Sequence, residues 1–203
     1  MTDSTLLDLK QELLATVTAS EIGFNSTPDT KQKIETLAEK IESLNPTSEP
    51  TSHIKSVAGR WQLLYSTFAL ERETNLTRLS FGKLPSANIS VTGIFQEIDL
   101  ADQQYNNLIE FTNNAGVKGV VGVTGRYTIV DSKRLNIDFV STYVKSLTND
   151  LNDQAFREAL ELGLTSHLEA QLAGSGWSDI TYLDEDLRLM RGNQQNLYVL
   201  LRQ

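Results

Sequence analysis

The feature that most constrains this chain lies between Gly59 and Val144, where several segments have apolar residues at every second position. A period of two is typical of β-strands that bury one face, because successive side chains point to opposite sides. Turn residues such as Asp102-Gln103-Gln104 interrupt the pattern and indicate an antiparallel meander. The region therefore predicts an antiparallel sheet.

The first strand of this sheet begins at the segment GRWQLLYST, which is predicted to place Trp61, Leu63, Tyr65 and Thr67 on one face. The apolar phase of a later strand changes near Gly93, which indicates a bulge or a bend. The weakly patterned stretch 70–82 fits either a strand or an ordered loop. The expected strands are 59–67, 88–100, 105–113, 117–130 and 134–144.

The C-terminal stretch Thr181–Arg202 predicts a strand, a turn and a second strand. A hairpin alone is marginal in water, so it must complete the sheet that begins upstream. The chain then holds about eight strands, which is the size of a small closed barrel. The pattern leaves open which face of the hairpin looks inward, the one with Leu187 and Leu189 or the one with Arg188 and Met190.

Helical periodicity precedes the sheet. Apolar residues at helical spacing predict a helix over 4–19 and another over 28–44, the latter with Thr27 as N-cap and Pro28 at its first position. The stretch 45–52 has the composition of a linker. The two apolar stripes suit an antiparallel helical hairpin that packs on the sheet, or alternatively one that binds a partner.

A further helical pattern lies at 149–173, between the meander and the closing hairpin. The apolar residues that recur there at steps of four are Phe156, Leu160, Leu164, Leu168 and Leu172. We interpret this segment as a helical insert that caps one mouth of the barrel. The predicted fold is therefore α+β, with a helical hairpin and linker at 1–52 and an antiparallel barrel domain of about eight strands at 53–203.

Composition excludes several classes of function. A net charge of −8 and a pI near 4.8 argue against nucleic acid as a partner. The absence of cysteine excludes disulfides and thiolate chemistry, and two histidines, His53 and His167, cannot form a multi-histidine metal site. No apolar run approaches the ~18 residues of a membrane span. No nucleophile motif accompanies either histidine, so we expect neither catalysis nor a cofactor.

Four glycines, Gly116, Gly119, Gly122 and Gly125, superficially resemble a phosphate-binding loop. A phosphate loop needs a helix N-terminus after its glycines, whereas these lie within a valine-rich strand. Glycines in a strand instead permit a bend at a barrel corner or leave room for a ligand beside the backbone.

The acidic cluster Asp184, Glu185 and Asp186 is the one local group that suggests metal or acid-base chemistry. On a strand only the first and third of these share a side, and two carboxylates make a poor metal site. We therefore expect a structural charge network rather than an enzyme. The expected partner is Arg188, Arg191 or Arg126.

Aromatic side chains are the best candidates for ligand contacts, because a barrel alternates inward and outward positions and several of them must line its interior. Periodicity does not decide whether that interior is packed solid or holds an apolar ligand. The candidate ligand-binding residues are Trp61, Tyr65, Phe95, Phe111, Tyr127, Phe139, Tyr143 and Tyr198.

Two segments of the chain form a pair of motifs. One is GRWQLLYST from Gly59 to Thr67, and the other is TYLDEDLR from Thr181 to Arg188, which continues through Arg191-Gly192-Asn193 to Leu200. Taken together they resemble the plastid-lipid-associated protein family, also called fibrillins or plastoglobulins. The resemblance implies a lipocalin-like barrel whose floor is closed by Trp61, with Arg202 or Arg191 packed on the indole face. The residues assigned to the family motifs or to structural roles are Gly59, Asp184, Asp186, Arg188, Arg191, Gly192 and Arg202.

The same resemblance implies function. Its members are associated with thylakoids and plastid lipid droplets and are thought to bind or organise apolar lipids, with roles in photoprotection. It implies a non-enzymatic protein that takes up a carotenoid, prenylquinone or acyl lipid, with a photoprotective or lipid-storage role. The alternative is a structural or adaptor protein with a solid barrel, whose helices bind a protein partner or a membrane surface.

No export signal or transit peptide is visible at the N-terminus. Since plant members carry a transit peptide, the resemblance favours a cyanobacterial protein, either cytoplasmic or peripherally associated with thylakoids. The insert at 149–173 is longer than the short connection of many relatives, and the cargo at that mouth therefore need not match theirs.

Overall fold

The computed structural model describes residues 3–68, 70–149 and 151–203. The helices are α1 (Asp3–Ala19), α2 (Pro28–Glu42), η1 (Pro50–His53), α3 (Ile54–Val57), α4 (Leu76–Leu79), α5 (Asp153–Ala159) and η2 (Asn193–Gln195). The strands are β1 (Gly59–Ser66), β2 (Glu73–Asn75), β3 (Asn88–Asp99), β4 (Gln104–Thr112), β5 (Lys118–Ile129), β6 (Arg134–Ser146), β7 (Glu169–Leu183), β8 (Leu187–Gly192) and β9 (Leu197–Arg202).

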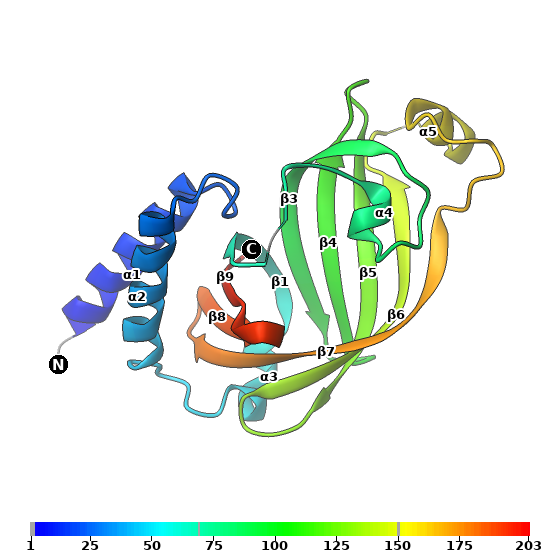
Figure 1. Ribbon diagram of the computed structural model, residues 1–203. Helices are drawn as coiled ribbons and strands as arrows, with labels where there is room; N and C mark the ends of the chain where they lie inside the picture. Colours follow the sequence, from blue (N-terminus) through cyan, green and yellow to red (C-terminus); the bar gives the residue numbers. More distant parts are fainter. Residues whose placement is uncertain (1–2, 69, 150) are drawn as a thin grey trace.

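The strands form one antiparallel sheet in the order β1-β9-β8-β7-β6-β5-β4-β3-β2, and β1 also pairs with β3. That second pairing closes β1 and β3–β9 into a barrel of eight strands and leaves β2 as an outer addition to β3 (Figure 1). Closure removes the unpaired edges that an open sheet would expose. The prediction of an α+β antiparallel barrel is confirmed.

Strand β1 closes the barrel because it pairs with β3 on one side and β9 on the other, so that Trp61 lies opposite both Gln96 and Arg202. The pairing with β9 shifts between Leu63 and Tyr65, which marks a bulge. Leu63 therefore faces the barrel interior, while Tyr65 belongs to the apolar cluster on the outside. The prediction that Trp61, Leu63 and Tyr65 share one face is therefore wrong for Tyr65.

Helices α1 and α2 pack side by side against the outside of the barrel, next to β1, β8 and β9 (Figure 1). Helix α2 begins as predicted, with the Thr27 side chain accepting a hydrogen bond from the amide of Thr30 and with Pro28 at the first helical position. The buried cluster between the helices and the barrel contains Leu13, Val17, Ile34, Leu37, Ala38, Ile41, Tyr65, Tyr182, Leu187, Leu189, Leu197 and Val199.

This packing decides the orientation of the closing hairpin. Leu187 and Leu189 face the helix pair, and Arg188 and Met190 face the barrel interior, where both are buried. The outward leucines are apolar because the helices cover them, so an apolar face does not identify the inside of this barrel. The division of the chain at residue 52 stays a prediction.

The predicted helical insert is wrong in its extent. Helix α5 covers only Asp153–Ala159, and β7 already begins at Glu169 and pairs with β6. Leucines four residues apart fit both structures, because four residues are about one helical turn and also two strand repeats. In β7, half-buried Leu172 alternates with exposed neighbours as a strand requires.

Two glycines of β5 make room for aromatic rings of the neighbouring strands. A Cβ on Gly119 would come 2.4 Å from the Phe111 ring, and one on Gly122 would come 2.2 Å from the Tyr143 ring. The ring of each aromatic residue thus occupies the space beside a glycine. The alternative that this space receives a ligand is wrong at these two positions.

Side chains close both ends of the barrel. At one end, Phe156 and Leu160 from α5 and the residue that follows it join the barrel core, so the insert does cap this mouth (Figure 1). At the other end, Trp61 and Val57 of α3 lie in the same core. A space is left inside the barrel between these two layers of side chains.

Candidate ligand cavity

A cavity of about 530 Å³ lies inside the barrel. Its volume is within the range of roughly 300–1,000 Å³ in which proteins hold small organic ligands. The lining residues that are apolar or aromatic are Leu63, Phe68, Leu70, Leu79, Phe81, Ile94, Tyr105, Ile109, Val123, Ile137, Phe139, Trp177, Met190 and Tyr198. The barrel is therefore not packed solid.

The mouth of the cavity is formed by three segments outside the regular barrel wall. Phe68 follows β1, Phe81 follows α4, and Asn193 and Gln194 lie in η2. The side chains of Phe68 and Phe81 are 51% and 61% exposed although both line the cavity. The Phe81 ring also stands against that of Phe139, with centroids 5.8 Å apart. The two exposed phenyl rings favour the approach of an apolar ligand.

The inner end of the cavity is polar. Gln96, Tyr105 and Ser178 line it, and all three are buried. Behind them Arg188, which is 0% exposed, donates from Nη2 to Gln96 Oε1 over 2.6 Å and from Nη1 to the carbonyl of Val57 over 3.4 Å. The strand register sets Gln96 opposite Trp61, so this end lies next to the barrel floor.

Burial governs the ionisation of these groups. It raises the pKa of Tyr105 to about 12, against an opposing effect of the Arg188 charge. It lowers the pKa of Arg188 to about 10, which still leaves the guanidinium charged at neutral pH. Buried charges usually have a carboxylate partner. Among the described residues, those accepting hydrogen bonds from Arg188 supply a carbonyl and an amide oxygen instead.

Trp61 lies between two arginines in the barrel floor. The guanidinium carbon of Arg202 is 4.1 Å from the indole centroid, and that of Arg188 is 4.6 Å from it. Arg202 also donates from Nη1 to the carbonyl of Ala58 and from Nε to that of Glu185. Gly59, with φ of +113°, supplies a backbone conformation that other residues rarely adopt. Of the two arginines expected on Trp61, Arg202 is there and Arg191 is not.

The predicted ligand-binding residues separate into three groups. Phe139 and Tyr198 line the cavity. The barrel core also buries Trp61, Phe111 and Tyr127, which do not line the cavity. Those that lie outside the interior, contrary to expectation, are Tyr65, Phe95 and Tyr143.

Bulges explain the three residues that face outward. The predicted bulge near Gly93 is confirmed by a register shift between Val91 and Gly93, and beyond it Ile94 and Gln96 face the interior. Phe95 thus points out, where the Arg60 guanidinium lies 4.1 Å from its ring centroid. Tyr143 follows a second shift, between Phe139 and Ser141, and Lys145 Nζ lies 4.6 Å from its ring.

Sequence reasoning missed the polar inner end altogether. Tyr105, Asn107 and Ile109 alternate along β4 and line one wall, so the period of two contained the signal for Tyr105. Gln96 and Ser178 lie on inward positions of strands with mixed polarity, and a polar residue there is ordinarily assigned to the outside. The loop residues Phe68 and Phe81 carry no periodic signal.

The acidic cluster forms the turn between β7 and β8, and its expected partners were wrong. Asp184 pairs with Lys10 of α1 at 2.5 Å and accepts a hydrogen bond from the Tyr182 hydroxyl. Its other oxygen accepts from the backbone amides of Asp186 and Leu187. Within the described part of the chain, no group of three or more acidic or histidine side chains is arranged to hold a metal ion.

Arg191 likewise serves the helix pair. Its guanidinium contacts Glu35 at 2.6 Å and Glu42 at 3.0 Å, both on α2. Gly192, at the end of β8, lies against Tyr198, because a Cβ there would come 2.9 Å from the ring. The family-motif residues of the hairpin therefore join the barrel to its helices and shape the wall beside Tyr198.

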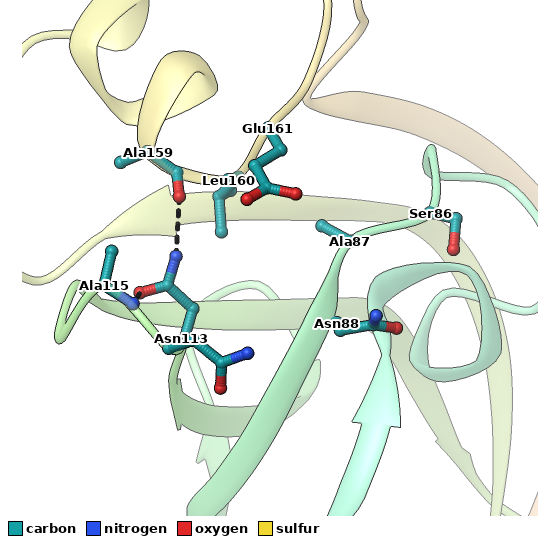
Figure 2. A pocket seen from close by; sticks show the side chains of 9 residues that line it. Ser86, Ala87, Asn88, Asn113, Ala115, Ala159, Leu160 and Glu161 are labelled. Atoms are coloured by element: carbon teal, nitrogen blue, oxygen red, sulfur yellow. Dashed lines mark hydrogen bonds between the residues drawn. The ribbon is translucent and has the colours of Figure 1, made fainter.

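A second, smaller pocket of about 190 Å³ lies outside the barrel next to α5. Figure 2 shows Asn113, from the turn after β4, directed at Ala159, and its amide donates to the carbonyl of that residue over 2.6 Å. Leu160 extends from the same segment toward the strands (Figure 2). The pocket is lined largely by polar groups. The hydrogen bond from Asn113 to Ala159 ties α5 to the end of the barrel that this helix caps.

A closed barrel of eight antiparallel strands around an apolar cavity places the chain in the lipocalin-like class of architectures. The family model described as PAP_fibrillin matches residues 7–201, and the chain belongs to this family. No solved structure matches it significantly. Among the described residues, no helix combines the length and apolarity needed to cross a membrane.

The chain is similar to several plant proteins. A chromoplast-specific carotenoid-associated protein of Cucumis sativus is 28% identical over 98% of this chain and 69% of its own length. A plastid-lipid-associated protein of Citrus unshiu is 27% identical, over 97% and 68%. Plastid-lipid-associated protein 6 of Arabidopsis thaliana is 23% identical, over 98% and 71%.

Proposed function

We propose that this protein binds a hydrophobic small molecule inside its barrel and acts without catalysing a reaction. The observation that carries the proposal is the apolar cavity of about 530 Å³, which opens between Phe68 and Phe81. The names of its relatives support the proposal, since they describe association with carotenoids and with plastid lipids. The ligand classes that fit are carotenoids, prenylquinones and acyl lipids.

The exposed rim favours uptake of the ligand from a membrane surface. Phe68 and Phe81 can enter the apolar layer of a bilayer while the cavity behind them receives the ligand. With a net charge of −8, attachment relies on these apolar groups rather than on attraction to anionic lipids. We place the protein peripherally at thylakoid membranes, in a photoprotective or lipid-storage role.

Binding is tested by fluorescence, because Trp177 lines the cavity. Addition of a prenylquinone or a carotenoid to the purified protein is expected to quench tryptophan emission saturably. In Val123→Phe, a ring added to an inward position fills part of the cavity and should weaken binding at least about tenfold. Val140→Phe is the matched control, since Val140 is exposed on β6.

Failure of the wild-type protein to quench or retain any of these ligands would refute the proposal. Equal weakening by Val123→Phe and Val140→Phe would place the binding outside the cavity. The adaptor alternative is not supported by the same structure, because the apolar faces of α1 and α2 that motivated it are already covered by the barrel.

A further inference from the structure

We infer that the inner end of the cavity is a polar subsite that receives an oxygen acceptor of the ligand, either a carbonyl or a carboxylate oxygen. The inference rests on the proposed function and assigns the ligand a chemistry and a direction. The oxygen-bearing end lies deepest, beside Gln96, Tyr105 and Ser178, and the apolar remainder extends toward Phe68 and Phe81.

Each of the three side chains can donate a hydrogen bond. Because Gln96 Oε1 accepts from Arg188, its amide nitrogen Nε2 is left as the group with hydrogens to give. Tyr105 stays protonated over the whole neutral range, since burial raises its pKa to about 12. Three donors placed together in an apolar cavity match a ligand acceptor such as a carbonyl or carboxylate oxygen.

Ser178 supplies the observation that points directly to a missing partner. Its hydroxyl oxygen is buried at the cavity wall and makes no hydrogen bond of ordinary geometry among the described residues, although it interacts with the nearby Tyr105 hydroxyl. Buried polar atoms are nearly always paired, and an unpaired one at a cavity wall is explained by a ligand atom that completes it. The Tyr105 hydroxyl interacts with the side chains of both Ser178 and Gln96, so the three polar groups lie together and one ligand oxygen can lie within reach of all of them.

The electrostatic potential at the inner end of the cavity is positive, which favours a hydrogen-bond acceptor of the ligand. Arg188 is fully buried directly behind Gln96, and its Nε also lacks a partner among the described residues. The acceptors it does have are uncharged. An uncompensated positive charge in a low-dielectric interior attracts the negative end of a carbonyl dipole and, more strongly, a carboxylate.

The decisive experiment compares three ligands that differ only at one end: palmitic acid, a methyl ketone of the same chain length and the matching alkane. Their affinities for the whole protein are measured at pH 7 by displacement of the neutral fluorophore N-phenyl-naphthylamine. We expect the acid and the ketone to bind about tenfold or more tightly than the alkane, the gain of a well-made buried hydrogen bond.

Variants locate that preference. Tyr105→Phe and Ser178→Ala each remove a donor with little change in shape and should weaken acid and ketone several-fold while leaving the alkane unchanged. Met190→Leu, at another lining position, is the control and should affect all three ligands alike. Far-UV circular dichroism and the melting temperature show that each variant is folded.

The outcomes separate the two claims. If the alkane binds as tightly as the acid and the ketone, or if both donor variants keep the full preference, the polar subsite is refuted while the hydrophobic cavity stands. If none of the three ligands displaces the fluorophore, this inference fails, and the proposed function is then decided by the prenylquinone and carotenoid titrations alone.

Discussion

Individual residues of this barrel perform tasks that their positions in the sequence do not reveal. Arg188 is the clearest case, because it is a charged residue on a strand whose neighbours Leu187 and Leu189 are apolar, yet it is the arginine that faces the interior. It packs on Trp61 and orients Gln96, so it joins the barrel floor to the polar end of the cavity.

Arg188→Met should therefore destabilise the protein by about 2 kcal/mol, which combines the loss of charge-assisted hydrogen bonds and of the indole contact with the relief of burying a charge. Urea denaturation followed by tryptophan fluorescence measures the difference. Arg126→Met is the matched control, since Arg126 is exposed on β5 and should change stability by no more than ~0.5 kcal/mol. Equal effects of the two substitutions would contradict the role given to Arg188.

The close contact between Gly122 and the Tyr143 ring, on the outside of β5, can be tested by substitution. In Gly122→Ala the new methyl group meets the Tyr143 ring at 2.2 Å, so the ring must move. We expect a loss of about 1–3 kcal/mol in the free energy of unfolding. Combining it with Tyr143→Ala should recover most of that loss, and a double-mutant cycle without coupling would show that the two residues do not compete for space.

At the scale of the elements, the sequence predicted what depends on local chemistry. The Thr27 cap, the strands of the meander and the bulge near Gly93 all follow from side-chain type and spacing. The positions that were misassigned or left undecided depend on what packs on both faces of a strand. Tyr65 and Leu189 are apolar because α1 and α2 cover them from outside, so apolar character could not tell inside from outside.

Most of the cavity lining could not be predicted from the sequence for a similar reason. Its polar end consists of residues whose polarity argues for a surface position, and its rim lies in loops without periodicity. The first part of β7, up to residue 173, was assigned to a helix because steps of four fit both periods. Only the tertiary arrangement, in which β7 completes the ladder with β6, decides between them.

The turn between β7 and β8 makes a prediction about pH, because Asp184 ties it to α1. Burial would raise the pKa of Asp184, but hydrogen bonds from Lys10, Tyr182 and two backbone amides outweigh it and hold the pKa below its ordinary value of 3.8. A carboxylate with a lowered folded pKa adds stability above its unfolded pKa. That contribution is lost as the pH falls from about 4 through the folded pKa.

Asp184→Asn should accordingly cost about 1 kcal/mol at pH 7 and less in strong acid, where the wild-type carboxyl is protonated as well. Urea unfolding of both proteins from pH 7 down to about pH 2 measures the difference. Asp102→Asn, in an exposed turn, is the control and should show no such convergence. A difference that stays constant with pH would rule out the carboxylate as its source.

On the scale of the whole molecule, the barrel is closed at the floor by Trp61 and at the opposite end by α5, so the rim of Phe68 and Phe81 is where the cavity meets the surface. The polar subsite lies at the floor and the apolar rim lies at the mouth. A ligand that enters with its oxygen first would leave its apolar part near the rim, where it is last to leave the membrane.

This arrangement separates the rate of uptake from the strength of binding. Replacing both rim residues, as in Phe68→Ser with Phe81→Ser, should slow transfer of a prenylquinone from neutral phosphatidylcholine vesicles several-fold, because fewer apolar groups enter the bilayer. The equilibrium affinity should change much less, since both side chains are half or more exposed. Stopped-flow quenching of Trp177 measures the transfer rate, and Val130→Ser, at an exposed valine in the turn after β5, is the control. Transfer that is equally fast in both variants would mean that the ligand enters from water, and the rim would then have no part in contact with a membrane.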